Sequence, residues 1–349
     1  MTDPATTDVI RQLPKVELHL HLETSLRLRR LARRSGEAGR PAAALVADPA
    51  RFSGYDRLRR IRHLSRAGIP DELYTAENIE AITAELLREA AAHHVRYLEV
   101  RVGGRRGFER LGIRPMLEAM ARARQRAAAE TGVRCGIVVT VVRERGPEEA
   151  VRRVREALAC RDCGVVGVDL AGDEENFPPA LFARAMDVAR DGGLGITVHA
   201  GEFSGPASVW TAVYQLGAHR IGHGIRAAED PDLLDLLRER QVTLEVCPTS
   251  NIALGLCASP SSHPVGRLLA AGVPVTVSSD DPLLLGTDIS RELALVASAC
   301  RLGPEGVAGL ILQAARAAFL PPAERAGLVA EIESSLGAAL ASDARTGLS

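Results

Sequence analysis

The sequence has no long apolar run, no dense set of cysteines and no large excess of charge of either sign. No apolar stretch approaches the roughly 20 residues that span a bilayer. The polar start MTDPATTD also lacks the charged and apolar regions of a signal peptide. These absences predict a cytoplasmic protein.

Cysteine is too sparse for a disulfide framework, because six cysteines are scattered over 349 residues. We therefore expect reduced thiols. Cys160 and Cys163 form a CxxC motif, but no second pair accompanies them, which favours a structural role over a redox or zinc-binding one.

Charge is nearly balanced, with a formal net charge of -1 and arginines spread along the whole chain. The sequence therefore has no basic face or tail that would predict binding to nucleic acid or to an anionic membrane. We expect a small-molecule partner, and a protein that is a monomer or a homodimer.

Length and periodicity favour one α/β fold, a (β/α)8 TIM barrel. With 349 residues and 46% hydrophobic content, the chain can bury a large core without needing two domains. Eight short apolar runs alternate with amphipathic segments rich in Arg, Glu and Ala, which is typical of this barrel. We predict one domain over residues 1–349, with further helices at the C-terminus. The expected strands are 16–21, 95–102, 135–142, 165–170, 195–199, 220–223, 242–247 and 273–279, and the expected helices include 147–161, 179–191, 206–216, 230–240 and 263–271.

Residues 22–94 are too many for one crossover between strands. We expect two or three helices there, near the mouth of the barrel. The apolar side chains of this insertion are either pocket or lid residues or ordinary helix packing, and the candidates are Phe52, Tyr55, Leu58, Ile61, Leu64 and Tyr74.

Two histidines one residue apart in the apolar run VELHLHL are the first sign of a metal site. Strand alternation places His19 and His21 on the same side of one strand, although this pair alone could simply lie on a polar strand face. Further candidates directly follow other apolar runs: His199 and Glu202 in TVHAGE, His223 in RIGHG, and Asp280 and Asp281 in VTVSSDDP.

Barrel enzymes carry their chemistry at the carboxyl ends of the strands, so we expect these side chains to converge on one mouth. Three imidazoles and one carboxylate suit a divalent transition metal such as zinc, with a position left open for water. The chain has one lysine, Lys15, and the predicted fourth strand, VVGVDLAG, has none. A carbamylated lysine that bridges two metals on this strand is therefore excluded, and we predict one zinc ion per chain.

These motifs resemble the adenosine deaminase family of the amidohydrolase superfamily. The resemblance runs from about residue 13 to about residue 293, through LPKVELHLHLE, VRYLEVR, VDLAGDE, TVHAGE, RIGHGIRAAEDPDLL, LEVCPTSN, HPVGRLLAAGVPVT and SSDDPLLLGTDISREL. It implies hydrolytic removal of a 6-amino group from a purine, with release of ammonia.

The resemblance also implies a role for each site residue. The zinc ligands would be His19, His21, His199 and Asp280. His223 would orient the attacking water and help to deprotonate it. Glu202 would donate a proton to purine N1, Asp281 would bind N7 and the attacking hydroxide, and the N–H of Gly172 would reach N3. His21 and Glu23 would also contact the substrate.

Simpler explanations exist for two of these residues. Glu202 could be a carboxylate at a helix N-terminus, and Asp281 before Pro282 could form a turn or a cap. The remaining histidines receive no role: His63, His93, His94, His219 and His263.

Two departures from the family pattern leave the substrate open. Members that act on adenosine follow the second histidine with Leu-Asp-Gly, where this chain has Glu23 and Thr24. The second strand usually ends EVRYSP, where this chain has Gly103 and Gly104. Both departures concern the sugar side of the pocket. Three hypotheses result: deamination of adenosine or a close nucleoside, deamination of another compound such as adenine or aminofutalosine, and a non-catalytic ligand-binding relative.

Overall fold

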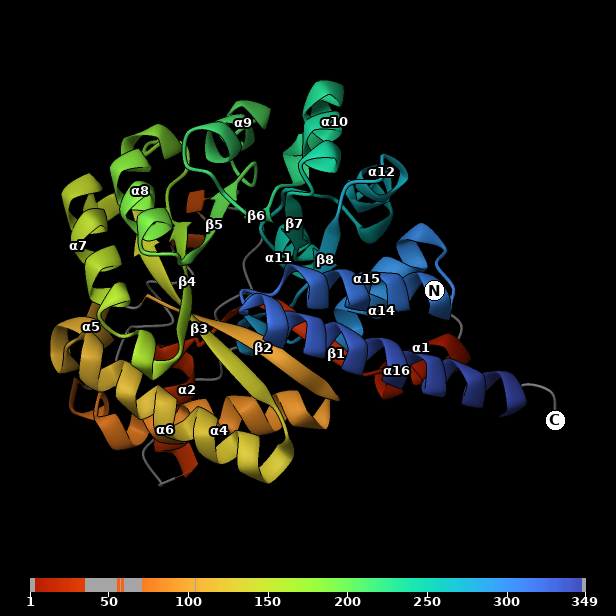
Figure 1. Cartoon of the computed structure of the whole chain (residues 1–349), viewed down its shortest axis with the longest axis horizontal. Helices are drawn as coiled ribbons and strands as arrows, with labels where there is room; N and C mark the ends of the chain where they lie inside the picture. The colour runs from red at the N-terminus through yellow and green to blue at the C-terminus, as the bar shows by residue number, and fades with distance from the viewer. Residues whose placement is uncertain (1–3, 35–54, 57, 60–70, 104, 347–349) are drawn as a thin grey trace.

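The computed structural model describes residues 4–34, 55–56, 58–59, 71–103 and 105–346. Its centre is an eight-stranded parallel sheet in which the strands follow one another in sequence order, surrounded by helices (Figure 1). The strands are β1 (Lys15–His21), β2 (Val95–Val102), β3 (Arg134–Val142), β4 (Val165–Ala171), β5 (Gly195–Ala200), β6 (Arg220–His223), β7 (Thr243–Val246) and β8 (Val275–Val277).

The sheet closes on itself where the segment after β8 returns to β1. Leu20 and Asp280 form a parallel bridge. The N–H of His21 donates to the Asp280 carbonyl at 2.8 Å, and the N–H of Asp280 donates to the His19 carbonyl at 3.0 Å. The predicted (β/α)8 barrel is therefore confirmed, and each strand lies within two residues of its expected bounds.

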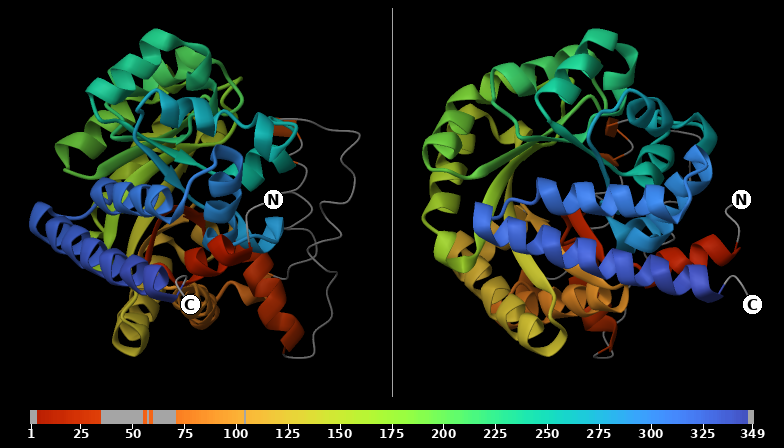
Figure 2. Two further views of the ribbon diagram at one scale, coloured as in Figure 1. Left: turned by 90° about the vertical axis from the view of Figure 1, so that its right-hand side faces the viewer. Right: turned by 45° about the vertical axis from the view of Figure 1, so that its right-hand side comes forward.

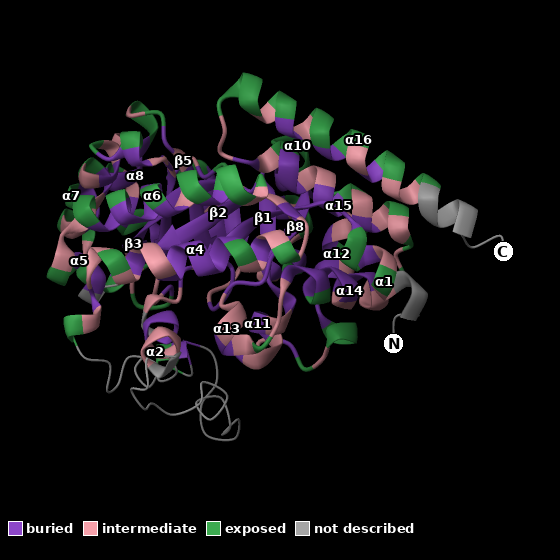
Figure 3. Cartoon of the chain, turned by 90° about the horizontal axis from the view of Figure 1, so that it is seen from below, coloured by how far each residue is buried: buried purple, intermediate pink, exposed green. Residues whose placement is uncertain are grey.

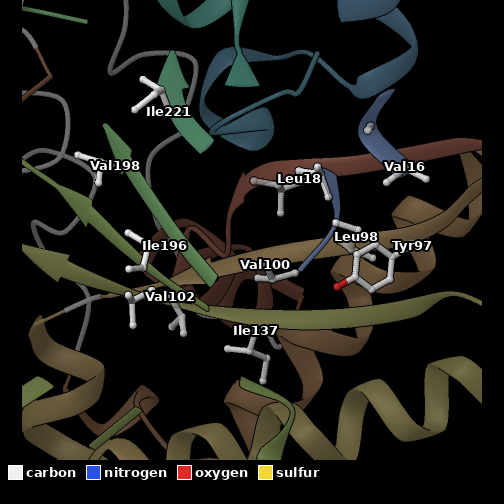
Figure 4. Packing of buried hydrophobic residues seen from close by; sticks show 14 of the residues in the cluster. Val16, Leu18, Tyr97, Leu98, Val100, Val102, Ile137, Ile196, Val198 and Ile221 are labelled. Carbon is white, nitrogen blue, oxygen red and sulfur yellow. The ribbon is translucent and has the colours of Figure 1, made fainter. Parts of the chain in front are cut away.

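Apolar side chains of neighbouring strands fill the space between the sheet and the helices, whereas buried polar residues such as Glu99, Arg101 and Glu245 lie inside the barrel. Residues such as Leu18, Val100 and Ile137 are fully buried, and Figure 4 shows side chains of five strands packed together. In most strands these apolar residues alternate with polar residues that face the barrel interior, and this alternation marked the strands in the sequence.

The helices lie outside the strands and keep exposed faces toward solvent (Figure 3). Several begin with proline, and Asp230 caps its helix by accepting the N–H groups of Asp232 and Leu233. The helices are α1 (Pro4–Gln12), α2 (Thr24–Arg34), α4 (Ala76–Ala92), α5 (Arg105–Leu111), α6 (Ile113–Thr131), α7 (Pro147–Leu158), α8 (Ala183–Asp191), α9 (Pro206–Tyr214), α10 (Pro231–Glu239), α11 (Pro248–Ala253), α12 (Val265–Ala270), α13 (Pro282–Leu285), α14 (Ile289–Cys300), α15 (Pro304–Ala317) and α16 (Pro322–Thr346).

The two ends of the barrel carry different helices. The short helices α11 and α13 follow the carboxyl ends of β7 and β8, and they lie with α2 at one end (Figure 3). At the opposite end, α16 packs beside α15, which itself packs against β8 and β1 (Figure 2). The C-terminal helices expected beyond the barrel are thus present.

The insertion between β1 and β2 differs in part from expectation. Helix α4 packs against β2 and α6 in the outer ring of helices, not over the mouth. Tyr74 belongs to the main core, so it packs as an ordinary helix-flanking residue and not as a lid. Tyr55 and Leu58 instead pack against Phe203 and Leu254. Phe52, Ile61 and Leu64 lie outside the described residues.

All six cysteines are free, as expected. Cys160 and Cys163 are buried at the end of α7 and in the turn that follows it. Within the described ranges, no helix combines the length and the apolar character needed to cross a bilayer.

Lys15, the only lysine, ties the start of β1 to its surroundings. Its buried ammonium donates to the carbonyl oxygens of Arg11 at 3.0 Å, Leu13 at 2.8 Å and His93 at 3.1 Å. Lys15→Met would leave three carbonyls without this donor, so we expect the free energy of unfolding to fall by about 3 kcal/mol.

Chemical denaturation monitored by circular dichroism measures this change. The exposed Arg152→Met is the matched control, and it should cost less than about 1 kcal/mol. Equal effects of the two substitutions would contradict a structural role for Lys15.

Candidate active site

Four imidazoles meet at the carboxyl ends of β1, β5 and β6. The ring centre of His19 lies 5.5 Å from that of His21, 4.7 Å from that of His199 and 4.8 Å from that of His223. These rings come from three strand ends that are far apart in the sequence, and they converge as the barrel predicts.

Asp280 completes this cluster from the end of β8. Its Oδ1 atom lies 3.5 Å from Nε2 of His19 and 3.4 Å from Nε2 of His21, and its Oδ2 atom lies 4.0 Å from Nε2 of His223. The Nε2 atoms of His19 and His21 are buried, and within the described part of the chain they have no hydrogen-bond partner. These donor atoms therefore point into a common space and fit a divalent metal ion.

Buried carboxylates fix the orientation of two of the rings. Nδ1 of His19 donates to Glu245 at 3.1 Å, and Nδ1 of His199 donates to Asp169 at 2.9 Å. Each contact leaves Nε2 facing the centre of the cluster. Carboxylates commonly hold metal-binding histidines in this way.

Arg101 lies between these two carboxylates. Its Nη2 atom bonds Glu245, and its Nε atom lies 3.5 Å from Asp169. Arg220 adds a second cation beside Glu245. Although burial opposes ionisation, His199 and Arg101 hold the pKa of Asp169 below its usual range, and Arg101 and Arg220 do the same for Glu245.

The protonation states also suit a cation. Burial lowers the pKa values of His21, His199 and His223, so these imidazoles are neutral at pH 7. Burial opposes ionisation of Asp280, but its close contact with His19 and the charges of the neighbouring histidines hold its pKa well below the ordinary value. For His19, burial and Arg101 lower the pKa, but the nearby Asp280 carboxylate and the hydrogen bond to Glu245 outweigh them and raise it. Asp280 and Glu245, which favour a proton on His19, would equally attract a metal ion.

Two residues of the cluster formed by the four imidazoles and Asp280 have strained backbones. His223 has φ 60° and Asp280 has φ 61°, in the left-handed region that non-glycine residues rarely adopt. Such strain costs about 1–3 kcal/mol per residue and persists only where surrounding contacts impose it. For Asp280, the two backbone hydrogen bonds to β1 supply such contacts.

Glu202 lies beside His223, with Oε1 3.5 Å from Nε2 of the imidazole, and its side chain is only 4% exposed. It precedes the first residue of α9 by four positions, so it is not a helix N-terminal carboxylate. The loop that carries it is held by Glu174, whose carboxylate accepts backbone N–H groups at 2.6–3.2 Å from the four residues 201–204.

A chain of hydrogen bonds sets the hydrogen position on His223. The N–H of Val265 donates to Nδ1 of His263, and Nε2 of His263 donates to Oδ1 of Asn251 at 3.1 Å. The Asn251 amide then donates to Nδ1 of His223 at 3.2 Å. Because burial lowers the pKa of His263 to about 4, this imidazole is neutral and the order of donors is fixed. The hydrogen of neutral His223 therefore lies on Nε2, which faces the cluster.

Asp281 follows Asp280 and stands at the N-cap position of α13, but its side chain does not cap that helix. Glu23 supplies the contact instead: its carboxylate accepts the N–H of Leu283 at 3.0 Å and of Leu284 at 2.8 Å. Burial and the nearby Asp281 raise the pKa of Glu23 to about 8. Glu23 thus holds the loop of Asp281, and its contact with a substrate stays a prediction.

Glycine residues at two strand ends permit close approaches. A Cβ at Gly172, where φ is +121°, would overlap the carboxylate of Glu144, which also accepts the hydroxyl of Tyr55. A Cβ at Gly103 would lie 2.5 Å from that of Thr140. A side chain at position 103 would therefore require Thr140 to move, and the effect of Gly103 on the sugar side of the pocket stays a prediction. Gly104 lies outside the described residues.

Several of these residues escaped the sequence reasoning. Asp169 and Glu245 are charged residues inside apolar strand runs, a signal that could have marked them. His263, to which we gave no role, and Asn251 carried no such signal. Cys247 also lies close to His19 and Asp280, and its thiol donates to the carbonyl of Glu245.

Comparison with known proteins gives consistent matches over most of the chain. A sequence model described as adenosine deaminase matches residues 14–335. An aminodeoxyfutalosine deaminase of Streptomyces avermitilis is 37% identical over 340 residues, covering 95% of this chain and 94% of that protein. An adenine deaminase of Rhizobium johnstonii is 36% identical over 333 residues, covering 92% and 99%. The crystal structure of an amidohydrolase from Burkholderia ambifaria with bound Zn superposes with a TM-score of 0.86 at 26% identity, covering 99% and 96%.

The buried Arg101 gives a prediction about stability. Arg101→Met would leave the carboxylates of Asp169 and Glu245 without their shared cation, so we expect unfolding to become easier by about 3–5 kcal/mol. Arg122→Met, which removes a surface pair with Glu80, is the control and should cost less than about 1 kcal/mol. Denaturant titrations compare the two variants, and a loss at Arg101 no larger than at Arg122 would show that the carboxylates do not need it.

Proposed function

We propose that this chain, which belongs to the adenosine deaminase family, hydrolytically removes the 6-amino group of an aminopurine and releases ammonia. The observation that carries the proposal is the meeting of four imidazoles, Asp280 and the buried Glu202 at one mouth. A non-catalytic relative would not need Glu202, whose removal from water is costly unless it serves a purpose.

The resident metal would be one zinc ion, held by His19, His21, His199 and Asp280. The unpartnered Nε2 atoms of the first two histidines and the ionised Asp280 support this choice. When bound, zinc would supply a nucleophile at neutral pH, because it lowers the pKa of coordinated water to about 7.

Glu202 would act as the proton donor to the purine ring. Addition of water at C6 breaks the ring's aromaticity and places electron density on N1, so a protonated carboxyl there stabilises the transition state more than the ground state. The 6-amino group would take up the proton released by the attacking water and leave as ammonia when the C6–N bond breaks, while the proton of the new C6 hydroxyl returns to Glu202. Glu174 serves this step indirectly, because it holds the loop that aims Glu202.

His223 would orient the attacking oxygen. Since its Nδ1 accepts from Asn251, its Nε2 carries the hydrogen and donates. This pattern favours an orienting role over a proton-accepting one, so the proton of the attacking water would pass to a carboxylate of the site, with Asp281 the candidate.

The purine would be held at N7 by Asp281 and at N3 by the N–H of Gly172, as the family pattern implies. Adenosine is our first candidate, with adenine, aminofutalosine or a modified adenosine as alternatives. The relatives named for adenine and aminodeoxyfutalosine support a 6-aminopurine and leave the group on N9 open. Among the described residues, Glu23, Glu144 and Tyr55 are the candidates for contact with the group on N9.

The metal content tests the first part of the proposal. We expect close to one zinc ion per chain in protein purified without added metal, because four ligands converge and the bridging lysine is absent. His19→Ala should lose the metal, whereas the control His93→Ala should keep it. Elemental analysis measures both, and a reproducible content near two, with both ions needed for activity, would contradict a mononuclear site.

Glu202→Gln tests the chemistry. We expect the variant to keep its zinc but to lose about 10²–10⁴-fold in kcat, the usual contribution of a general acid. Glu175→Gln, an exposed neighbour on the same side of the barrel, is the matched control and should be unchanged. Ammonia release from adenosine, adenine and aminodeoxyfutalosine gives kcat/KM for each. If zinc-loaded wild type released ammonia from none of a broad panel of 6-aminopurines, the proposed activity would be wrong.

A further inference from the structure

A second cavity lies at the end of the barrel opposite to the candidate active site. Its volume is about 1000 Å³, and its floor includes the first residues of four neighbouring strands, Val165, Gly195, Arg220 and Thr243. The segment that joins α15 to α16 forms one wall, and these two helices mark this end of the barrel in Figure 2. We refer to it as the basal cavity.

The basal cavity is strongly cationic. No aspartate or glutamate occurs among its described lining residues, whereas six arginines do: Arg161, Arg190, Arg220, Arg240, Arg316 and Arg325. Six arginines that are far apart in the sequence thus line one cavity. A pocket of 300–1,000 Å³ is typical of small-molecule sites.

Half of these arginines have compensating carboxylates. Arg220 pairs with Glu99 and Glu245 inside the barrel. Outside it, Arg190 lies 2.8 Å from Asp187, and Arg316 lies 3.5 Å from Glu333. These three charges therefore do not require a ligand.

The other three arginines have no carboxylate within 4 Å among the described residues: Arg161, Arg240 and Arg325. Arg240 lies over the ring of Tyr214, 4.5 Å from its centre. They come from three separate parts of the chain, so side-chain packing within one helix does not explain their convergence.

Helix ends explain only part of the pattern. Cations are favourable at helix C-termini, which accounts for Arg190 in α8, Arg240 after α10 and Arg316 in α15. Arg325, however, lies in the first turn of α16, where the helix dipole disfavours a cation. Arg161 lies in the short turn between α7 and β4.

His219 adds a neutral donor to the same surface. Its Nδ1 accepts the N–H of Ile196 at 3.1 Å, so in the neutral ring Nε2 carries the hydrogen. Burial lowers the pKa of His219, and the charges of Arg220, Arg190 and Arg325 lower it further. The lowered pKa of His219 is thus partly a result of the positive charge around the cavity.

We propose that the basal cavity binds a multiply charged phosphate anion, such as pyrophosphate or the polyphosphate group of a nucleotide. Three uncompensated guanidinium groups and one N–H donor match the charge and the many acceptor oxygens of such a group. Guanidinium forks bind phosphate oxygens in pairs, which gives both charge and geometry. The proposal does not depend on the deaminase activity, because it concerns binding at the other end of the barrel.

Isothermal titration calorimetry tests the proposal with pyrophosphate and ATP, at constant ionic strength. We expect saturable binding of at least one of them to the purified protein. The double variant Arg161→Ala, Arg325→Ala should weaken it by about 10–100-fold, because each charge-assisted contact is worth more than a neutral one. Arg122→Ala, Arg126→Ala is the control with the same change in net charge, since these two exposed arginines pair with Glu80 elsewhere.

Each outcome decides the question. Saturable binding that the cavity variant loses and the control keeps supports the proposal. No saturable binding, or equal weakening in both double variants, overturns it, because the arginines then act only as a diffuse surface charge. Equal affinity for pyrophosphate and ATP would identify the phosphate group alone as the ligand, whereas tighter binding of ATP would identify a nucleotide.

Phosphates can also bind zinc, so the titration is repeated after the metal is removed. Binding at the basal cavity should survive this treatment, and binding that disappears with the metal overturns the proposal. Circular dichroism of the double variant checks that the barrel remains folded.

Discussion

The buried Arg101 guanidinium, between the carboxylates of Asp169 and Glu245, is the interaction on which the candidate metal site depends. Two carboxylates inside a barrel would otherwise be expected to take up protons. With Arg101 present they stay ionised and accept the Nδ1 hydrogens of His199 and His19. The Nε2 atoms of both rings then face the centre. The charge of Arg101 thus determines that His19 and His199 present their Nε2 atoms, and not their Nδ1 atoms, to a metal ion.

The site also contains strained backbone, which the contacts around it impose. The left-handed conformations of His223 and Asp280 turn the chain sharply at the ends of β6 and β8. Neither conformation is favourable by itself, so each must be imposed by the frame around it. For Asp280 the frame is β1, because hydrogen bonds to His19 and His21 close the barrel at the point where the carboxylate is needed. The hydrogen bonds that close the barrel therefore also place the Asp280 carboxylate in the site.

The barrel and the convergence of the ligands were predictable because both follow from local patterns. The apolar residues that face the helices recur in each strand, and the carboxyl ends of parallel strands must meet. Contacts between distant loops leave no such pattern. The relay from His263 through Asn251 to His223 and the contact of Glu23 with the start of α13, 260 residues away, arise only when the chain is folded. Tyr74 was ambiguous for a related reason: an aromatic residue beside a helix reads the same in a core and in a lid.

The two ends of the barrel are chemically distinct although they share one charged residue. Arg220 lines the basal cavity, and it also pairs with the Glu245 that holds His19. Its charge is compensated inside the barrel by Glu99 and Glu245, and Phe319 stacks on its guanidinium at 3.5 Å. An anion at the base would therefore meet the uncompensated arginines before it could compete for Arg220. Inside the barrel, Glu99 and Glu245 pair with Arg220 and separate the two ends electrostatically.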